Sequence, residues 1–222
     1  MSKAIEVNDL GRMAYRAAWE VQERIHERVA TGGAEAILIV EHPPVITLGR
    51  REDSIRNLIT SPEELARKNV ELIRSDRGGD ITYHGPGQIV AYPIIRIADH
   101  GFSVSGYVHR LEAIVLQTLA ELGIEAHTDS KAVGVWTKDD GELAKVCAIG
   151  VRIRRGISLH GLALNYDIDL AGFDDIVPCG LTGRKVTSIR KILGKEAPSL
   201  DETKRVLIRN LIKPSKTFGL GS

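Results

Sequence analysis

Two cysteines and one lysine are the side chains of this chain best suited to covalent chemistry. Cys179 lies in the stretch IVPCGLTG (176–183), where proline and glycine neighbours indicate a loop. In such a loop the backbone amides of Gly180 and Leu181 can face an oxyanion, as acyl transfer requires. A free cysteine is more commonly a small buried hydrophobic residue, so a nucleophilic role also requires a base that activates the thiol.

Lys145 is the candidate activator, because it opens the predicted strand KVCAIGV (145–151). A lysine at this place is either an exposed charge at the end of a strand or a buried base. Strand alternation predicts that Cys147 points to the same face as Lys145. The residue pattern alone therefore leaves both thiols as candidate nucleophiles.

A glycine-rich stretch, RGGDITYHGPGQ (77–88), precedes a run of strand-forming residues. Gly78 and Gly79 allow backbone amides to approach a bound group closely, and Arg77 offers a charge near the edge of the segment. Tyr83 and His84 supply hydrogen-bond donors, which strand alternation directs to opposite faces. The pattern indicates a binding segment, and the alternative is a glycine-rich hairpin whose polar groups have partners within the protein.

Composition excludes several classes of protein. The chain has 222 residues with 30 basic and 29 acidic side chains, so no excess positive charge points to a nucleic-acid partner. No apolar run approaches the roughly 20 residues that span a membrane. The N-terminal sequence has no signal-peptide core, which predicts a cytoplasmic protein. Two cysteines in so long a chain predict free thiols and no disulfide framework.

No cofactor or metal is predicted. GLTGRKVTS (180–188) has a glycine near a lysine but lacks the Walker spacing, and no dinucleotide-binding glycine motif joins a strand to a helix. The seven histidines are scattered without the spacing of metal ligands. His84, His160 and the two cysteines could in principle meet around a zinc ion, but nothing in their spacing favours a zinc site.

Hydrophobic patterns predict an α/β (α+β) fold with mixed β-sheets flanked by helices. Capping boxes begin helices at Ser61 and Ser199, and Asp140-Gly141 and Arg155-Gly156 are predicted hairpin turns. Pro93 within 88–97 indicates an edge strand or a bulge. One domain over residues 1–222 is expected. Helices are predicted at 12–30, 104–122 and about 199–212, and strands at 36–42, 45–51, 70–76, 88–97, 132–137, 145–154 and 157–168.

Four separate motifs occur in an order that resembles the lipoyl(octanoyl) transferase family. They are residues 77–88, KVCAIGV (145–151), HGLALN (160–165) and PCG (178–180), and EHPPVITLGR (41–50) is similar to the early strand-turn-strand of that family. The resemblance covers roughly residues 9 to 190. It implies the fold of the biotin and lipoate protein ligases. It also implies transfer of an octanoyl group from octanoyl-acyl carrier protein to a lysine of a lipoyl-accepting domain.

The resemblance assigns roles to particular residues. Cys179 matches the cysteine that carries the acyl group as a thioester, and Lys145 matches the lysine that activates it. Cys147 falls where the family usually has a small residue, which favours a packing role. The implied substrate-binding residues are Arg77, Gly78, Gly79, Asp80, Ile81, Thr82, Tyr83, His84, Ala148, Ile149, Gly150, Gly161, Leu162 and Ala163.

The implied reaction needs neither ATP nor a metal, because exchange of a thioester for an amide runs downhill. The implied acceptors are the lipoyl domains of 2-oxoacid dehydrogenase complexes and the glycine cleavage H protein. One alternative is an ATP-dependent lipoate- or biotin-protein ligase of the same fold, which needs no nucleophilic cysteine. A second is a catalytically silent module that binds a carrier protein. The PCG motif together with Lys145 favours the transferase.

Overall fold

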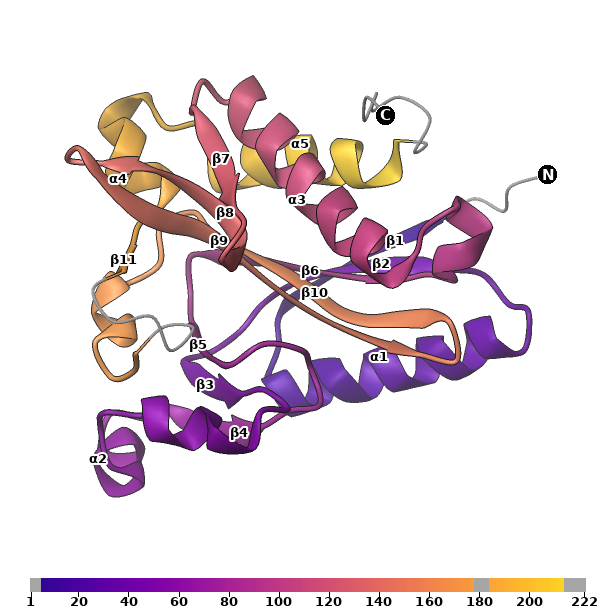
Figure 1. Cartoon of the computed structure of the whole chain (residues 1–222), viewed down its shortest axis with the longest axis horizontal. Coiled ribbons are helices and arrows are strands. Elements are labelled where there is room, and N and C mark those ends of the chain that lie inside the picture. Colours follow the sequence, from indigo (N-terminus) through magenta and orange to yellow (C-terminus); the bar gives the residue numbers. More distant parts are fainter. Residues whose placement is uncertain (1–4, 178–183, 214–222) are drawn as a thin grey trace.

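A computed structural model describes residues 5–177 and 184–213 (Figure 1). The helices are α1 (Tyr15–Ala30), α2 (Pro62–Arg67), α3 (Val104–Glu121), α4 (Ile189–Leu193) and α5 (Leu200–Ile212). Shorter 3-10 turns are η1 (Glu52–Asn57), η2 (Ile97–His100), η3 (Leu170–Phe173) and η5 (Gly194–Glu196). The strands are β1 (Glu6–Arg12), β2 (Ala36–Glu41), β3 (Val45–Leu48), β4 (Glu71–Arg74), β5 (Ile81–His84), β6 (Gln88–Ile94), β7 (Ala126–Asp129), β8 (Ala132–Asp139), β9 (Glu142–Arg154), β10 (Ile157–Asn165) and β11 (Lys185–Val186).

Two mixed sheets form the framework, as the sequence predicted. The large sheet has the order β1-β2-β6-β10-β9-β8-β7, and the short strand β11 pairs with β9. The β1–β2 and β11–β9 pairs are parallel, and the other pairs of this sheet are antiparallel. The small sheet has the order β4-β3-β5, with β3 parallel to β4 and antiparallel to β5.

Helices cover both faces of the large sheet, with α1 on one side and α3 and α5 on the other (Figure 1). Alternation along the strands explains this arrangement. In β2, Leu38 packs in the cluster under α1, whereas its neighbours Ile37 and Ile39 pack in the cluster under α3 and α5. A strand buried on both faces reads as a continuous apolar run, and AILIV (36–40) is such a run.

The local signals for caps and turns are confirmed. The hydroxyl of Ser61 accepts a hydrogen bond from the amide of Glu64, and that of Ser199 accepts one from Glu202. The turn residues Asp140-Gly141 have φ values of 50° and 81°, and Arg155-Gly156 have 50° and 75°. Positive φ at both positions is the conformation of the type I′ turn, which is common in two-residue hairpins.

Of the two alternatives predicted for Pro93, an edge strand or a bulge, the edge strand is wrong, because β6 lies between β2 and β10 in the interior of the sheet. The ladder is instead irregular beside Pro93. The register between β6 and β10 begins only at Ala91 and Leu162, and the Ser158 hydroxyl donates to the Pro93 carbonyl at 2.7 Å. His160 in β10 adopts φ +57° at this place. The missing amide of proline is therefore accommodated by an irregular partner strand.

Among the residues described here, no helix is both long and apolar enough to cross a membrane.

Candidate active site

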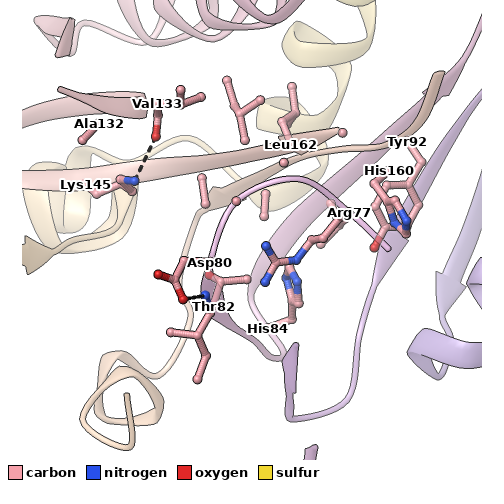
Figure 2. A pocket seen from close by; sticks show the side chains of 18 of the residues that line it. Arg77, Asp80, Thr82, His84, Tyr92, Ala132, Val133, Lys145, His160 and Leu162 are labelled. Carbon is pink, nitrogen blue, oxygen red and sulfur yellow. Dashed lines mark hydrogen bonds between the residues drawn. The ribbon is translucent and has the colours of Figure 1, made fainter. Parts of the chain in front are cut away.

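A cavity of about 260 Å³ lies between the two sheets, where residues 77–84 face β9 and β10 (Figure 2). Most of the residues predicted to bind substrate meet in its wall, although the sequence separates them into three segments. Those that line it are Arg77, Gly79, Asp80, Ile81, Thr82, His84, Ala148, Ile149, Gly150, Gly161, Leu162 and Ala163, together with Lys145. Their role in binding a substrate remains a prediction.

Two members of the predicted set, Gly78 and Tyr83, do not line the cavity. The Gly78 amide donates to the Val151 carbonyl at 2.9 Å, and a Cβ atom on Gly78 would lie only 2.8 Å from that oxygen. Gly78 is therefore required for a close approach of two backbones. The Tyr83 ring packs edge-on against Phe173 in the core of the small sheet. Strand alternation thus separates it from His84, as predicted.

Lys145 is buried, with 5% of its surface exposed, which rules out the alternative of a charge at the exposed end of a strand. Its Nζ atom donates to the Val133 carbonyl at 2.9 Å (Figure 2). The same atom lies 4.6 Å from the centre of the Trp136 ring, within the range of a cation–π interaction. Lys145 begins no strand, because β9 starts at Glu142.

The prediction that Cys147 shares the face of Lys145 is wrong. The register of β8 against β9 shifts between Val135, opposite Cys147, and Trp136, opposite Lys145. This bulge adds one residue to β9, so Val146 and Cys147 both lie in the hydrophobic cluster under α3. Burial raises the pKa of the Cys147 thiol to about 12. Cys147 is therefore a packing residue in this fold.

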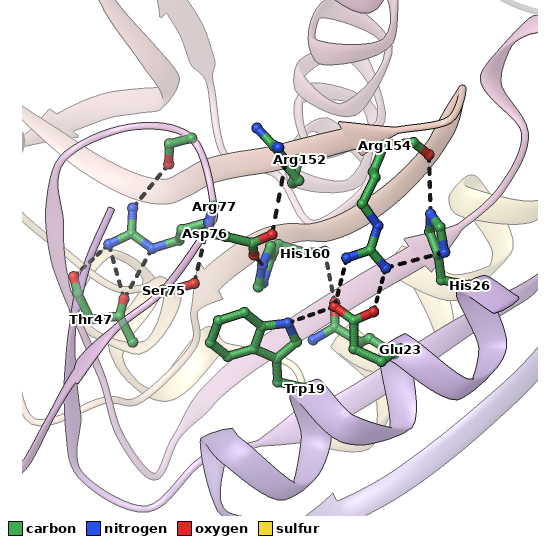
Figure 3. A network of polar contacts seen from close by, with 12 residues as sticks. Trp19, Glu23, His26, Thr47, Ser75, Asp76, Arg77, Arg152, Arg154 and His160 are labelled. Carbon is green, nitrogen blue, oxygen red and sulfur yellow. Dashed lines mark hydrogen bonds and ion pairs between the residues drawn. The ribbon is translucent and has the colours of Figure 1, made fainter. Parts of the chain in front are cut away.

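Arg77 was expected to place a charge at the edge of the glycine-rich segment, and the structure buries it instead. Its Nε and Nη2 atoms donate to the Thr47 hydroxyl at 3.0 and 2.9 Å, and Nη2 also donates to the Thr47 carbonyl at 2.6 Å (Figure 3). Nη1 donates to the Gly78 carbonyl at 3.1 Å. These bonds tie the cavity wall to strand β3 of the small sheet.

A polar network at His160 was not predicted from the sequence (Figure 3). The His160 Nε2 atom lies 2.7 Å from Asp76 Oδ1, and its Nδ1 atom lies 3.3 Å from the Tyr15 hydroxyl. The hydrogen bond from His160 holds the pKa of Asp76 below its usual range, and burial lowers the pKa of His160. A neutral imidazole therefore donates through Nε2 and accepts through Nδ1 at the wall of the cavity.

His84 lies in the cavity wall and carries a buried hydrogen-bond acceptor. Its Nδ1 atom donates to Gln88 Oε1 at 2.7 Å, so the lone pair is on Nε2, which has no hydrogen-bond partner among the described residues. Burial, reinforced by the nearby His42, lowers the pKa of His84 to about 3. Gln88 in turn donates to Asn165 Oδ1 at 2.8 Å, which fixes the orientation of the amide.

Several further residues of the wall come from elements that carry no motif. Tyr15 belongs to α1, while Val90 and Tyr92 belong to β6. Only long-range packing brings these three residues to the cavity. His160 is a further residue of the wall, and it does lie within a motif, HGLALN. The lining residues missed by the sequence analysis are Tyr15, Arg51, Val90, Tyr92, Lys131, Ala132, Val133 and His160.

Cys179, with Gly180 and Leu181, lies outside the described residues. The chain before that segment is held by a hydrogen bond of 2.7 Å from the Val177 amide to the Asn57 carbonyl. The chain after it forms β11, in which Val186 pairs with Lys145. Over residues 5–177 and 184–213, no three histidine, cysteine, aspartate or glutamate side chains are grouped so that they could hold a metal ion.

The arrangement of the sheets defines the class of protein. The chain superposes on lipoate-protein ligase A bound with ATP with a TM-score of 0.75, covering 94% of this chain and 84% of that chain at 16% identity. A bipartite lipoate protein ligase from Thermoplasma acidophilum gives a TM-score of 0.72 at 15% identity, covering 94% of this chain and 83% of that chain. Biotin protein ligase from Aquifex aeolicus with biotin and ATP gives 0.58 at 13% identity, covering 98% and 73%. The fold is that of the lipoate and biotin protein ligases.

Sequence comparison then gives the family. Residues 14–212 match the model of the lipoyl protein ligase A/B catalytic domain. The chain is 44% identical to an octanoyltransferase from Chloroflexus aurantiacus over 211 residues, 94% of this chain and 93% of that protein. It is 44% identical to an octanoyltransferase from Mycobacterium bovis over 202 residues, 90% of this chain and 83% of that protein. The chain belongs to the lipoyl protein ligase A/B catalytic-domain family, and it is an acyltransferase that moves octanoyl groups in lipoate biosynthesis.

Proposed function

We propose that the enzyme takes the octanoyl group from octanoyl-acyl carrier protein, holds it as a thioester on Cys179 and passes it to a lysine of a lipoyl-accepting domain. The observation that carries this proposal is the buried Lys145, whose Nζ atom lies at the wall of a largely apolar cavity. An ammonium or amine buried beside apolar side chains is positioned for proton transfer in a water-poor site.

The size and lining of the cavity fit an acyl chain. A cavity of about 150 Å³ accommodates the six carbons of benzene, so eight carbons need about 200 Å³. The cavity of about 260 Å³ exceeds that volume. Ile81, Val90, Ile149 and Leu162 give it apolar walls. At about 0.8 kcal/mol for each buried methylene, the chain contributes several kcal/mol of binding free energy.

In the first proposed step, Lys145 accepts the proton of the Cys179 thiol. The thiolate attacks the thioester carbonyl, the new sulfur–carbon bond forms, and the bond to the carrier thiol breaks. The departing carrier thiolate takes the proton back from Lys145. In the second step the acceptor amine attacks the enzyme thioester, Cys179 leaves as thiolate, and Lys145 takes the proton that the amine loses. Each step exchanges one acyl bond for another, so no ATP is consumed.

The contacts that border residues 178–183 support a place for Cys179 beside Lys145. Asn57, whose carbonyl accepts from Val177, donates its side-chain amide to Asp80 Oδ2 in the cavity wall at 2.9 Å. On the other side, the Thr187 amide donates to the Lys145 carbonyl at 3.0 Å. The described chain on each side of residues 178–183 is thus connected by hydrogen bonds to a residue of the cavity wall.

The acceptors that we propose are the lipoyl domains of 2-oxoacid dehydrogenase complexes and the glycine cleavage H protein. The Thermoplasma acidophilum ligase that shares this fold is described together with its E2 lipoyl domain, which supports an acceptor of this kind. We also propose that residues 1–222 act as one catalytic domain, since the family model extends over residues 14–212.

An ATP-free transfer assay tests the proposal. The enzyme, octanoyl-acyl carrier protein and an apo lipoyl domain are mixed without nucleotide, and intact-protein mass spectrometry follows the octanoyl mass. We expect the mass first on the enzyme and then on the lipoyl domain. Strict dependence on ATP, with free octanoate as the better donor, would assign the enzyme to the ligases. Transfer with no enzyme adduct, even after rapid quenching, would argue against the thioester.

A further inference from the structure

Lys145 and the buried carboxylate of Glu112 form hydrogen bonds with opposite sides of the same peptide group. Lys145 Nζ donates to the Val133 carbonyl at 2.9 Å, and the Gly134 amide donates to Glu112 Oε1 at 3.1 Å. The Val133 carbonyl and the Gly134 amide belong to one peptide bond. In a trans peptide these two groups point in opposite directions, so the peptide lies between the lysine and the carboxylate.

Helix α3 buries the carboxylate of Glu112 against strand β8. Only 5% of Glu112 is exposed, and its other oxygen lies 3.0 Å from Nδ1 of the exposed His109. A buried carboxylate is costly unless hydrogen bonds compensate for lost water. The fold therefore retains a charged acceptor at the point where the Gly134 amide needs one.

The conformation at Gly134 makes this acceptor necessary. Gly134 has φ +126°, and a Cβ atom there would lie 2.6 Å from the Cys147 carbonyl oxygen. Glycine moves between such conformations at little cost, so the peptide before it can turn over easily. A turned peptide would direct the Val133 carbonyl away from Lys145. The bond to Glu112 opposes that rotation.

We propose that Glu112 is a positioning residue that fixes the Val133–Gly134 peptide, so that Val133 holds the Lys145 amine at the cavity. The effect on catalysis rests on the proposed function of Lys145, whereas the effect on the Lys145 amine does not.

Two substitutions separate the hydrogen bond from packing. Glu112→Met keeps the volume of the side chain and removes the acceptor, whereas Glu112→Gln keeps an oxygen that accepts from Gly134. Both variants are labelled with trace acetic anhydride, and mass spectrometry compares acetylation of Lys145 with that of the exposed Lys195. We expect acetylation of Lys145 to rise about tenfold in Glu112→Met, the factor for a lost hydrogen bond of about 1.4 kcal/mol. In Glu112→Gln it stays within about twofold of the wild type.

In the transfer assay kcat falls about tenfold in Glu112→Met, with KM for the lipoyl domain unchanged, and Glu112→Gln restores it. The proposal would be overturned if Lys145 in Glu112→Met were acetylated to the same extent as in the wild type. It would also be overturned if Glu112→Met and Glu112→Gln changed this acetylation equally. If Glu112→Met does not fold, amide hydrogen exchange in the wild type tests the hydrogen bond from Gly134 to Glu112 instead. Gly134 must exchange much more slowly than Gly141, and equal rates would refute the bond to Glu112. Labelling and exchange use no octanoyl donor, so they remain decisive even if the wild type transfers nothing.

Discussion

Replacing Gly79 with valine should strongly slow acylation of the enzyme while leaving it folded. Gly79 has φ +86°, and a Cβ atom on it would meet only Arg77 Nη1, at 3.5 Å. The added side chain therefore enters the cavity without colliding with the backbone. Because the residue lies in the cavity wall, the new atoms occupy space that the proposed acyl chain needs.

Two effects follow, and their magnitudes differ. A side chain in the left-handed region costs about 1–2 kcal/mol of folding free energy, a decrease in Tm of about 2–8 °C for a protein of this size. If the valine displaces two or three methylenes of the acyl chain, about 2 kcal/mol of binding free energy is lost. That loss corresponds to a decrease in affinity of about 30-fold.

Gly123→Val is the matched control. Gly123 has φ +79°, with no atom within 4 Å of an added Cβ, and it follows α3 outside the cavity wall. Both variants should lose similar thermal stability, measured by calorimetry. At donor concentrations well below saturation, mass spectrometry should show the octanoyl adduct forming about 30-fold more slowly only in Gly79→Val. If Gly79→Val is acylated at the rate of Gly123→Val, residue 79 does not face the acyl chain.

Three further predictions concern the thiols, the lysine and the buried histidines. Cys179→Ala should abolish the octanoyl adduct in mass spectrometry, whereas Cys147→Ala keeps most activity, and the reverse result would make Cys147 the nucleophile. Lys145→Ala should lower the transfer rate by about 10²–10⁴-fold, and Lys145→Arg should recover little because arginine does not release a proton near neutrality. Iodoacetamide should alkylate Cys179 at lower pH in the wild type than in Lys145→Ala, and identical profiles would exclude activation by the lysine. Burial lowers the pKa of His42 to about 4 and that of His84 to about 3, so below about pH 6.5 the unfolded chain binds protons that the folded protein does not. The free energy of unfolding in urea should therefore fall as the pH decreases from about 6.5, by about 1.4 kcal/mol per pH unit for each of these histidines, and a flat profile would contradict this.

Local signals in the sequence predicted local structure well. The capping serines and the paired turn residues Asp140-Gly141 act within a few residues, so their effect can be inferred without knowing the fold. The glycine-rich segment 77–88 was predicted to bind a group from its own residues, whereas segments 148–150 and 161–163 were identified through family resemblance. Physical reasoning alone did not predict their convergence, because it depends on the order of strands in two sheets.

The errors share one cause, which is contact between segments that are far apart in the sequence. The face of Cys147 depends on a bulge that exists only because β8 pairs with β9 out of strict register. The position of Pro93 inside the sheet depends on the irregular partner strand, where the Ser158 hydroxyl donates to the Pro93 carbonyl. Tyr15 reaches the cavity from a helix whose sequence shows only an amphipathic stripe. Such effects arise from contacts between residues far apart in the chain.

The left-handed conformation of His160 has a consequence for engineering this enzyme. At φ +57° a side chain costs about 1–2 kcal/mol relative to glycine. A substitution rule that considers only backbone conformation would therefore favour glycine at position 160, although the imidazole is buried against Tyr15, Trp19 and Tyr92. That choice would also delete the imidazole that joins Asp76 to Tyr15 beside the cavity. Thermostable variants of this scaffold should keep position 160 fixed and seek their gains elsewhere.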